Sequence, residues 1–205
     1  VDSAAVVGDI FYVFGGCVLV SQKEVYSTVF EYDPKEDKFK QKRDMPTPRG
    51  GLGAAAFGGK IYAIGGFDFE EGVSNIVEVY DPSTDKWEAK KPMPVSRALF
   101  GITTLSGRIF AIGGLGTFSD GGNDEVLKRV DVYNPANDEW VIDEAIPLPR
   151  GRAGVPATVA GGKIYVPGGR AGVQSFPSIY EYTPGSLSVS PQDKLTTLWG
   201  RLKQP

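Results

Sequence analysis

Short apolar segments that end in a pair of glycines recur along this chain. Residues 61–64 read Ile-Tyr-Ala-Ile and are followed by two glycines, and such β-branched and aromatic runs favour a buried strand. Three similar segments occur elsewhere. The second glycines of the four segments lie 50, 48 and 55 residues apart, at Gly16, Gly66, Gly114 and Gly169. Self-similarity at this period indicates a chain built from repeated structural units.

Each repeat predicts four short strands. In the second repeat they fall at residues 52–57, 60–64, 76–80 and 86–89. Clusters of Gly, Asp-Pro and Ser-Thr separate these segments, and none of them shows a helical period. A chain of 205 residues is long enough to form one all-β domain with a full core. The pattern therefore predicts an all-β fold.

Three further landmarks keep a fixed position in the repeats. The third strand ends in a tyrosine, followed by Asp, Asn or Thr and then proline, which favours a turn. These tyrosines are Tyr32, Tyr80, Tyr133 and Tyr182. Seven residues after the tyrosine stand Phe39, Trp87 and Trp140, whereas the fourth repeat has Val189. An arginine lies 17 residues before the second glycine in three repeats, at Arg49, Arg97 and Arg152.

This combination of arginine, Gly-Gly, Tyr-Asp-Pro and tryptophan resembles the kelch-repeat family, within the galactose oxidase-like group of β-propellers. The resemblance implies a β-propeller of four four-stranded kelch-type blades over residues 1–189. The blade boundaries are expected near residues 1–48, 49–96, 97–149 and 150–189. Residues 190–205 match no repeat element, and we expect them to form an extra strand, a cap or a clamp between the first and last blades.

The two end blades raise the question of ring closure. A blade cannot bury both faces of its sheet alone, so each blade needs a neighbour on either side. We therefore expect either a closed ring of four blades or a homo-oligomer in which a larger ring is completed between chains.

Composition removes several classes of function. The net charge is -3 and the pI is near 5.1, so there is no basic surface that would favour nucleic acid or an anionic membrane. The chain contains no histidine and one cysteine, Cys17, which excludes an intrachain disulfide and a thiolate metal cluster. No apolar run approaches the roughly 18 residues of a membrane helix. We expect no cofactor, no targeting segment and no membrane insertion, and the compartment stays open.

The resemblance also implies where a partner binds. In kelch propellers the loops between the second and third strands usually carry the binding surface, and here they differ strongly from blade to blade, as binding loops do. Phenylalanines beside acidic residues in these loops fit a partly basic peptide or stacked sugar rings. The predicted ligand-binding residues are Phe67, Asp68, Phe69, Glu70, Phe118, Asp120, Asn123, Asp124, Arg150 and Arg170.

The sequence offers two other candidate sites. Oxygens from Asp120, Asp124 and Glu125 are a weak candidate for Ca²⁺, although their spacing matches no EF-hand loop. The three repeat-position arginines could line an anionic site. The stronger interpretation makes them scaffold residues, paired with acids such as Glu78 and Asp131 two positions before the blade tyrosine.

The sequence predicts a non-enzymatic binding module whose partner is a protein or a glycan. Copper radical oxidases of the kelch group need histidine ligands, and the absence of histidine excludes that activity. A carbohydrate-active enzyme resembling the sialic-acid (N-acetylneuraminate) epimerases could work with carboxylates and arginines, and it is kept as the alternative.

Overall fold

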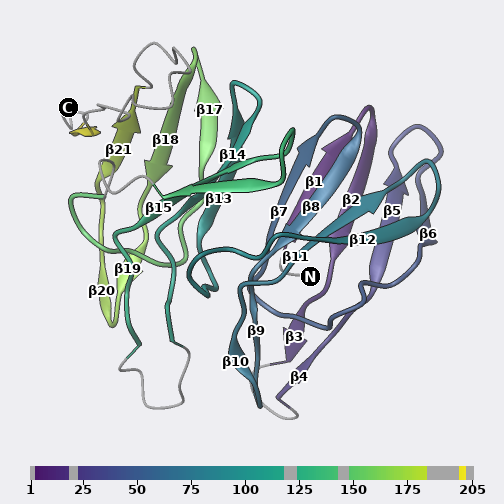
Figure 1. Ribbon diagram of the computed structural model, residues 1–205, viewed down its shortest axis with the longest axis horizontal. Coiled ribbons are helices and arrows are strands. Elements are labelled where there is room, and N and C mark those ends of the chain that lie inside the picture. The colour runs from purple at the N-terminus through teal and green to yellow at the C-terminus, as the bar shows by residue number, and fades with distance from the viewer. Residues whose placement is uncertain (1–2, 19–22, 118–123, 143–147, 184–198, 202–205) are drawn as a thin grey trace.

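The computed structural model describes residues 3–18, 23–117, 124–142, 148–183 and 199–201, and these residues form strands and loops without a helix. Four antiparallel sheets of four strands stand side by side in chain order (Figure 1). The prediction of an all-β propeller with four-stranded blades is thereby confirmed. Within the described part of the chain, no helix is long and apolar enough to cross a bilayer.

Each blade takes its strands in sequence order from the inside outwards. Blade one holds β1 (Ser3–Val7), β2 (Ile10–Phe14), β5 (Val29–Asp33) and β6 (Lys38–Gln41), and blade two holds β7 (Gly53–Phe57), β8 (Lys60–Ile64), β11 (Val77–Asp81) and β12 (Lys86–Lys90). Blade three holds β13 (Gly101–Leu105), β14 (Arg108–Ile112), β15 (Val130–Asn134) and β16 (Glu139–Ile142). Blade four holds β17 (Thr158–Ala160), β18 (Lys163–Pro167), β21 (Ile179–Tyr182) and β22 (Trp199–Arg201).

Tight turns connect the two inner strands of each blade. Between β7 and β8, Gly58 and Gly59 have φ angles of +60° and +75°, in the left-handed region that glycine enters without steric cost. Two consecutive residues of this conformation match the twist of a two-residue hairpin. The register follows from the turn, and Ala55 lies opposite Tyr62.

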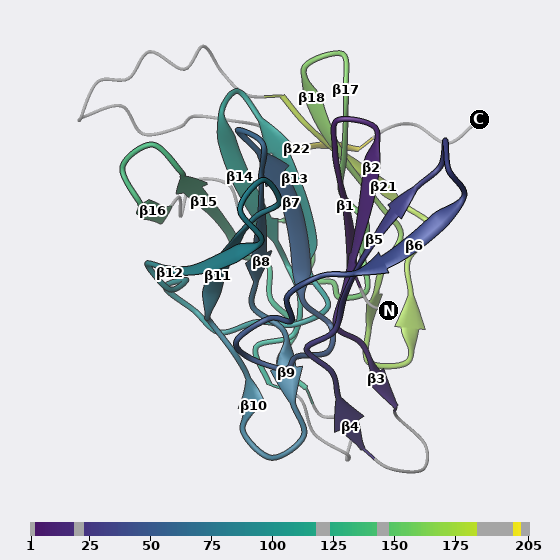
Figure 2. The ribbon, with the colours of Figure 1, turned by 90° about the vertical axis from the view of Figure 1, so that its right-hand side faces the viewer.

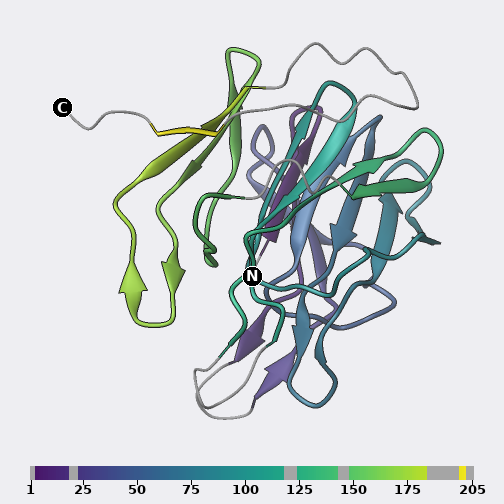
Figure 3. The same ribbon diagram turned by 60° about the vertical axis from the view of Figure 1, so that its left-hand side comes forward.

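The inner strands β1, β7, β13 and β17 contact one another in chain order, so every blade packs on the next. Among the described strands, no comparably extensive contact joins β1 to β17. Figure 1 shows blade four at the left and blade one at the right, and Figure 3 shows blade four, in yellow-green, at the left edge of the molecule. The described blades therefore form an arc with blades one and four at its two ends.

Aromatic rings fill the space between neighbouring blades. The rings of Tyr80 and Trp87 in blade two lie 6.0 Å from Tyr12 and 6.1 Å from Phe14 in blade one, centroid to centroid. Tilted aromatic pairs at this separation contribute about 0.5–1.5 kcal/mol beyond the burial of their area. The same contact recurs as Tyr62 with Tyr133, at 5.8 Å, and Phe110 with Tyr182, also at 5.8 Å.

A polar contact accompanies each of the first two aromatic interfaces. The Trp87 indole donates to the carbonyl of Arg43 at 2.9 Å, and the Arg43 N–H donates to Oδ1 of Asp85 at 3.0 Å. The Tyr80 hydroxyl donates to the same carboxylate at 2.7 Å. Blade three repeats this arrangement with Trp140, Lys91, Asp138 and Tyr133. The tryptophan of the repeat thus bonds to a residue just after the last strand of the preceding blade, and the tyrosine reaches the same residue through the aspartate of its own blade.

The repeat-position arginines connect blades through both their backbone and their side chain. The carbonyl of Arg97 accepts the Gly66 N–H of blade two at 2.9 Å, and its guanidinium reaches into blade three, where it pairs with Asp131. Arg49 similarly places its guanidinium 2.7 Å from Oε2 of Glu78 and donates to the carbonyl of Gly65 at 2.7 Å. Arg49, Arg97 and Arg152 are each at most 1% exposed.

Blade four departs from this scheme. Arg152 has no acid at the equivalent position, and its guanidinium lies 4.0 Å from the ring centre of Tyr180 and donates to the carbonyl of Gly168 at 2.5 Å. The outermost strand of the blade is β22, within the segment expected to be an extra strand, a cap or a clamp, and it pairs with β21. Val189, which stands at the aromatic position of the repeat, lies outside the described residues.

The Asp85 contact predicts a pH-dependent contribution to stability. The hydrogen bond from Tyr80, followed by that from the Arg43 N–H, lowers the pKa of Asp85. A depressed pKa in the folded state stabilises the protein above the unfolded pKa, near ~3.9, and this stability is lost as the pH falls through the folded pKa. We expect Asp85→Asn to unfold more easily in urea at pH 7. The difference from the wild type should shrink as the pH falls below about 4, and a difference that stays constant with pH would contradict this assignment.

The Arg49–Glu78 pair predicts a larger effect. Arg49→Met leaves the buried Glu78 carboxylate without its cation, and we expect a loss of about 3–5 kcal/mol in the free energy of unfolding. The double variant Arg49→Met/Glu78→Met removes both charges and should recover most of this loss. Equal instability of the single and double variants, measured by chemical denaturation, would show that the charge pair is not the cause.

Candidate functional site

The connections between the second and third strands of the blades lie at one end of the molecule. Three of them fold into short hairpins, formed by β3 (Cys17–Val18) with β4 (Glu24–Val25), β9 (Phe67–Asp68) with β10 (Gly72–Val73), and β19 (Arg170–Ala171) with β20 (Gln174–Ser175). In blade three a bridge between Leu115 and Val126 takes the same place. Figures 1 and 2 show the labelled hairpins at the lower end of the molecule, and we call this surface the hairpin face.

The Gly-Gly pairs fix where each hairpin leaves its blade. Gly65 has a φ of +59°, and a Cβ at this position would lie 2.5 Å from the carbonyl oxygen of Arg97. Any side chain there would force apart blades two and three. The glycines therefore let the arginine backbone of the next blade approach closely, and this contact sets the base of the hairpin.

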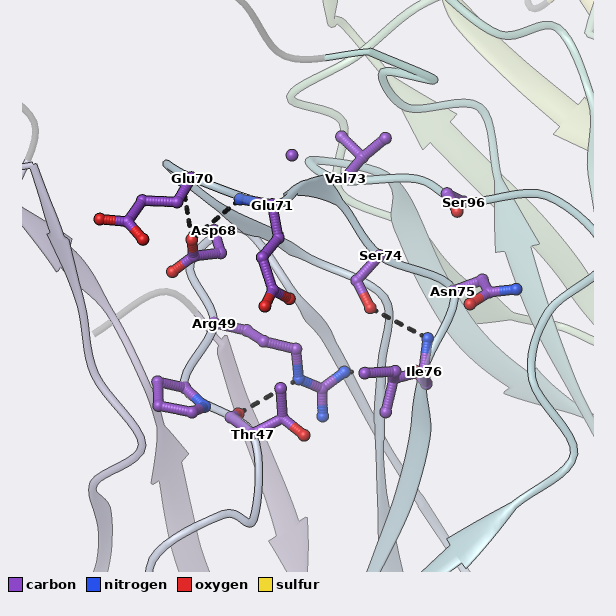
Figure 4. Close-up of a pocket in the computed structure, with 12 residues that line it drawn as sticks. Thr47, Arg49, Asp68, Glu70, Glu71, Val73, Ser74, Asn75, Ile76 and Ser96 are labelled. Atoms are coloured by element: carbon purple, nitrogen blue, oxygen red, sulfur yellow. Dashed lines mark hydrogen bonds between the residues drawn. The ribbon is translucent and has the colours of Figure 1, made fainter.

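A pocket of about 410 Å³ opens beside the blade-two hairpin. Figure 4 shows the carboxylates of the hairpin grouped on one side of the pocket, with Thr47 on the other. Its lining comes from the connection between blades one and two, from the hairpin itself, and from the residues around the next connection. These residues are Thr47, Pro48, Arg49, Asp68, Glu70, Glu71, Gly72, Val73, Ser74, Asn75, Ile76 and Ser96.

The acidic side of the pocket is built by a local turn. Oδ1 of Asp68 accepts the backbone N–H groups of Glu70 and Glu71, at 2.7 and 3.1 Å. An aspartate bonded to the backbone two and three residues ahead holds the tip of a hairpin in one conformation. Glu70 and Glu71 themselves are exposed. The turn thus presents two glutamates from a fixed backbone.

Arg49 is the one cation among the residues that line the pocket, and its charge is already paired with that of Glu78. The guanidinium is buried against Glu78, and burial lowers its pKa while the carboxylate opposes that shift. In the described part of the chain, no ion pair involves Asp68, Glu70 or Glu71. The pocket therefore carries three carboxylates that form no ion pair with the described residues.

The structure separates the predicted residues of the blade-two loop into two groups. Asp68 and Glu70 line the pocket, whereas Phe67 is 1% exposed and packs beneath the hairpin, so it offers no surface to a ligand. Phe69 is half-buried, edge-on to Phe67 with ring centres 5.3 Å apart. The two phenylalanines pack on each other within the hairpin, and the buried one, Phe67, belongs to strand β9, whereas Phe69 lies in the turn that follows it.

The predicted residues of blade four form a separate basic region. Arg150 and Arg170 are both exposed, and neither lines the blade-two pocket. Arg150 donates to Oε1 of Gln174 at 3.1 Å and lies 4.6 Å from the ring centre of Phe176. The hairpin face is thus acidic at blade two and basic at blade four.

The blade-three loop contributes little to the described site. Phe118, Asp120 and Asn123 lie outside the described residues. Among the described residues, no three side chains of the His, Cys, Asp and Glu types come together as a metal site, and this includes Asp124 and Glu125. The calcium hypothesis has no support from the part of the site that the structure describes.

Sequence reasoning missed most of the pocket wall. Glu71 directly follows the predicted residue Glu70, and this adjacency was its only signal in the sequence. Thr47, Ser74 and Ser96 carry no signal of their own, because they come from connections that meet only when two blades pack together.

The comparisons with known proteins agree with this architecture. The kelch motif matches residues 3–46, 48–94 and 96–142. The chain is 40% identical over 81 residues to a putative F-box/kelch-repeat protein from Arabidopsis thaliana, which covers 38% of this chain and 20% of that protein. It is 38% identical over 77 residues to Kelch-like protein 21 from Danio rerio, covering 37% of this chain and 11% of that protein.

A solved structure gives the same fold. The structure of YjhT aligns with a TM-score of 0.77 at 18% identity, over 98% of this chain and 64% of that one. Of the two curated relatives named above, by contrast, the chain spans only about a fifth or less of the length. Since the three motif matches cover more than half of its residues, with repeat landmarks that bind consecutive blades together, this chain belongs to the kelch-repeat family.

Proposed function

We propose that this chain is a non-enzymatic protein-interaction module that binds a basic segment of a partner protein on its hairpin face. A lysine or arginine side chain of the partner enters the blade-two pocket. The observation that carries this proposal is the group of three carboxylates in the pocket, from Asp68, Glu70 and Glu71, which form no ion pair within the part of the chain that the structure describes.

The chemistry of the pocket suits a cation on a long side chain. Its volume of about 410 Å³ is ample for one such side chain, and Val73 and Pro48 offer apolar surface to the methylene groups. An arginine fork can bond a carboxylate through two parallel N–H groups. Because Glu70 and Glu71 are exposed, each ion pair contributes only about 0.2–1 kcal/mol and is weakened by salt.

Membership in the kelch-repeat family favours a protein partner over a glycan. Kelch-repeat proteins typically bind proteins, and both curated relatives are kelch proteins of greater length. A glycan would stack on exposed aromatic rings, but Phe67 is buried and Phe69 is half-buried. The hairpin of blade two therefore offers a glycan less than it offers a basic peptide.

Among the described residues, no observation supports the enzymatic alternative. A sugar epimerase needs convergent acids, one of which is held protonated by a raised pKa. In the described part of the chain, the carboxyl groups with a clear shift, Asp81, Asp85 and Glu181, all have a lowered pKa. None of the three lines the pocket.

Charge reversal tests the proposed site. A fluorescent peptide of alternating arginine and serine serves as the probe, and its binding is followed by anisotropy at low and at physiological salt. We expect Glu70→Lys/Glu71→Lys to weaken binding about five- to tenfold, because two attractive ion pairs become repulsive. An acidic peptide of the same length should not bind the wild type.

The matched control is Glu36→Lys/Glu139→Lys, which changes the net charge equally at two exposed positions away from the pocket. This control should keep nearly all of the affinity. Equal losses in both double variants would show that binding depends on overall charge and would contradict the proposed pocket.

A further inference from the structure

One repeat position lies at the base of every hairpin, six residues before the blade tyrosine. Its residues are Tyr26, Ser74, Leu127 and Phe176. In all four blades the backbone N–H at this position donates to the carbonyl of the second glycine of the Gly-Gly pair, at 2.8–2.9 Å. In the first three blades its carbonyl accepts the N–H of the arginine of the next blade, within 3.3 Å. The backbone at this hairpin-base position is therefore held in the same way from blade to blade, and the side chain is what changes.

In blade four this side chain is a large ring that occupies the space beside the repeat-position arginine. Phe176 is 8% exposed, and its ring centre lies 5.2 Å from the guanidinium of Arg152 and 4.6 Å from that of Arg150. Arg150 is the counterpart of Thr47, because each lies two residues before the repeat-position arginine. A stacked arginine and phenylalanine therefore stand where blade two has the small side chains of Thr47 and Ser74.

The other two blades also carry a larger side chain than serine at the hairpin-base position. Leu127 in blade three is 8% exposed, and a Cβ added to Gly116 would lie 3.2 Å from its Cδ2 atom. Tyr26 in blade one is 38% exposed, and its hydroxyl donates to Oε2 of Glu24 at 3.0 Å. Serine is the smallest of the four residues, so blade two has the least side-chain volume at the base of its hairpin.

The pocket of blade two opens at this position. Ser74 lines it together with Thr47 and Arg49. The Ser74 hydroxyl accepts the backbone N–H of Ile76 at 3.1 Å, and Figure 4 shows the hydroxyl turned toward that N–H. Serine hydroxyls commonly bond to nearby backbone groups in turns. The small side chain thus stays against its own backbone and leaves open the space that Phe176 occupies in blade four.

We propose that Ser74 is the specificity-determining residue of the blade-two pocket, and that the space beside it selects a long cationic side chain over a short one. This inference rests on the proposed binding of a basic segment. A short cation reaches Glu70 and Glu71, which are exposed, and gains only their ion pairs. A longer side chain additionally buries its methylene groups against Val73 and Pro48.

Side-chain size at position 74 accounts for this selection, and charge does not. Replacing Ser74 by leucine leaves the three carboxylates of the pocket in place and gives blade two the side chain that blade three carries on an equivalent backbone. The cation is then still attracted by the hairpin, but its methylene groups find the pocket closed. Full burial of two methylene groups strengthens binding by about 15-fold, and we expect roughly fivefold for a side chain that keeps part of its exposure.

Two fluorescent peptides test this inference by anisotropy. One alternates lysine with serine, and the other carries 2,4-diaminobutyrate in place of lysine, which has the same ammonium group on a chain two methylenes shorter. We expect the wild type to bind the lysine peptide about fivefold more tightly. Ser74→Leu should lower the affinity for the lysine peptide to that for the diaminobutyrate peptide, whose own affinity should not change. Salt should weaken both complexes alike.

Ser74→Ala is the matched control, because it removes the hydroxyl bond to Ile76 but leaves the pocket open. It should keep the preference for the lysine peptide. Ser74→Val adds less volume than leucine and should show an intermediate preference. Urea unfolding of all three variants reports whether the blades stay folded.

A preference for the lysine peptide that persists in Ser74→Leu overturns the inference. An equal loss of preference in Ser74→Ala also overturns it, because the hydroxyl would then matter and not the size of the side chain. If the wild type binds both peptides equally and Glu70→Lys/Glu71→Lys weakens both, the inference fails while the proposed function stands. Binding of neither peptide overturns the proposed function as well.

Discussion

The guanidinium groups of Arg49, Arg97 and Arg152 are buried cations at the junctions between consecutive blades. Removing such a charge from water costs several kcal/mol unless carbonyls or a counter-charge replace the lost hydration. Each arginine meets this requirement with groups of the following blade, while its own backbone is bonded to the preceding one. One residue therefore orients two sheets. The Gly-Gly pair is its counterpart, because only a residue without Cβ allows the arginine carbonyl so close.

This constraint also shapes the candidate site. Arg49 lines the pocket, yet Glu78 neutralises it from within the blade, so it does not cancel the charge of the hairpin. The same residue that orients blades one and two places Thr47 opposite the acidic turn at Asp68. Arg49, which orients the blades, therefore lies beside the residues of the proposed binding surface. The part that varies from blade to blade is the hairpin.

Blades one and four depart from the repeat at single positions. Blade one carries Phe39 where the inner blades carry tryptophan, and phenylalanine has no N–H that needs a carbonyl from a preceding blade. In blade four, Tyr180 replaces the acid and holds Arg152 by its ring. Blades one and four thus differ from blades two and three at these two repeat positions.

Period, strands and landmarks were predictable from the sequence by itself, because they are local. Hydrophobic alternation, Gly-Gly turns and Asp-Pro turns depend on a few consecutive residues, and their recurrence at about 50 residues identified the blade. The burial of Phe67 beneath a half-buried Phe69, the pocket that joins Thr47 to Ser96, and the arrangement of blades one and four in an arc were not predictable. They depend on how whole sheets pack against one another, and such long-range contacts leave no pattern in adjacent residues.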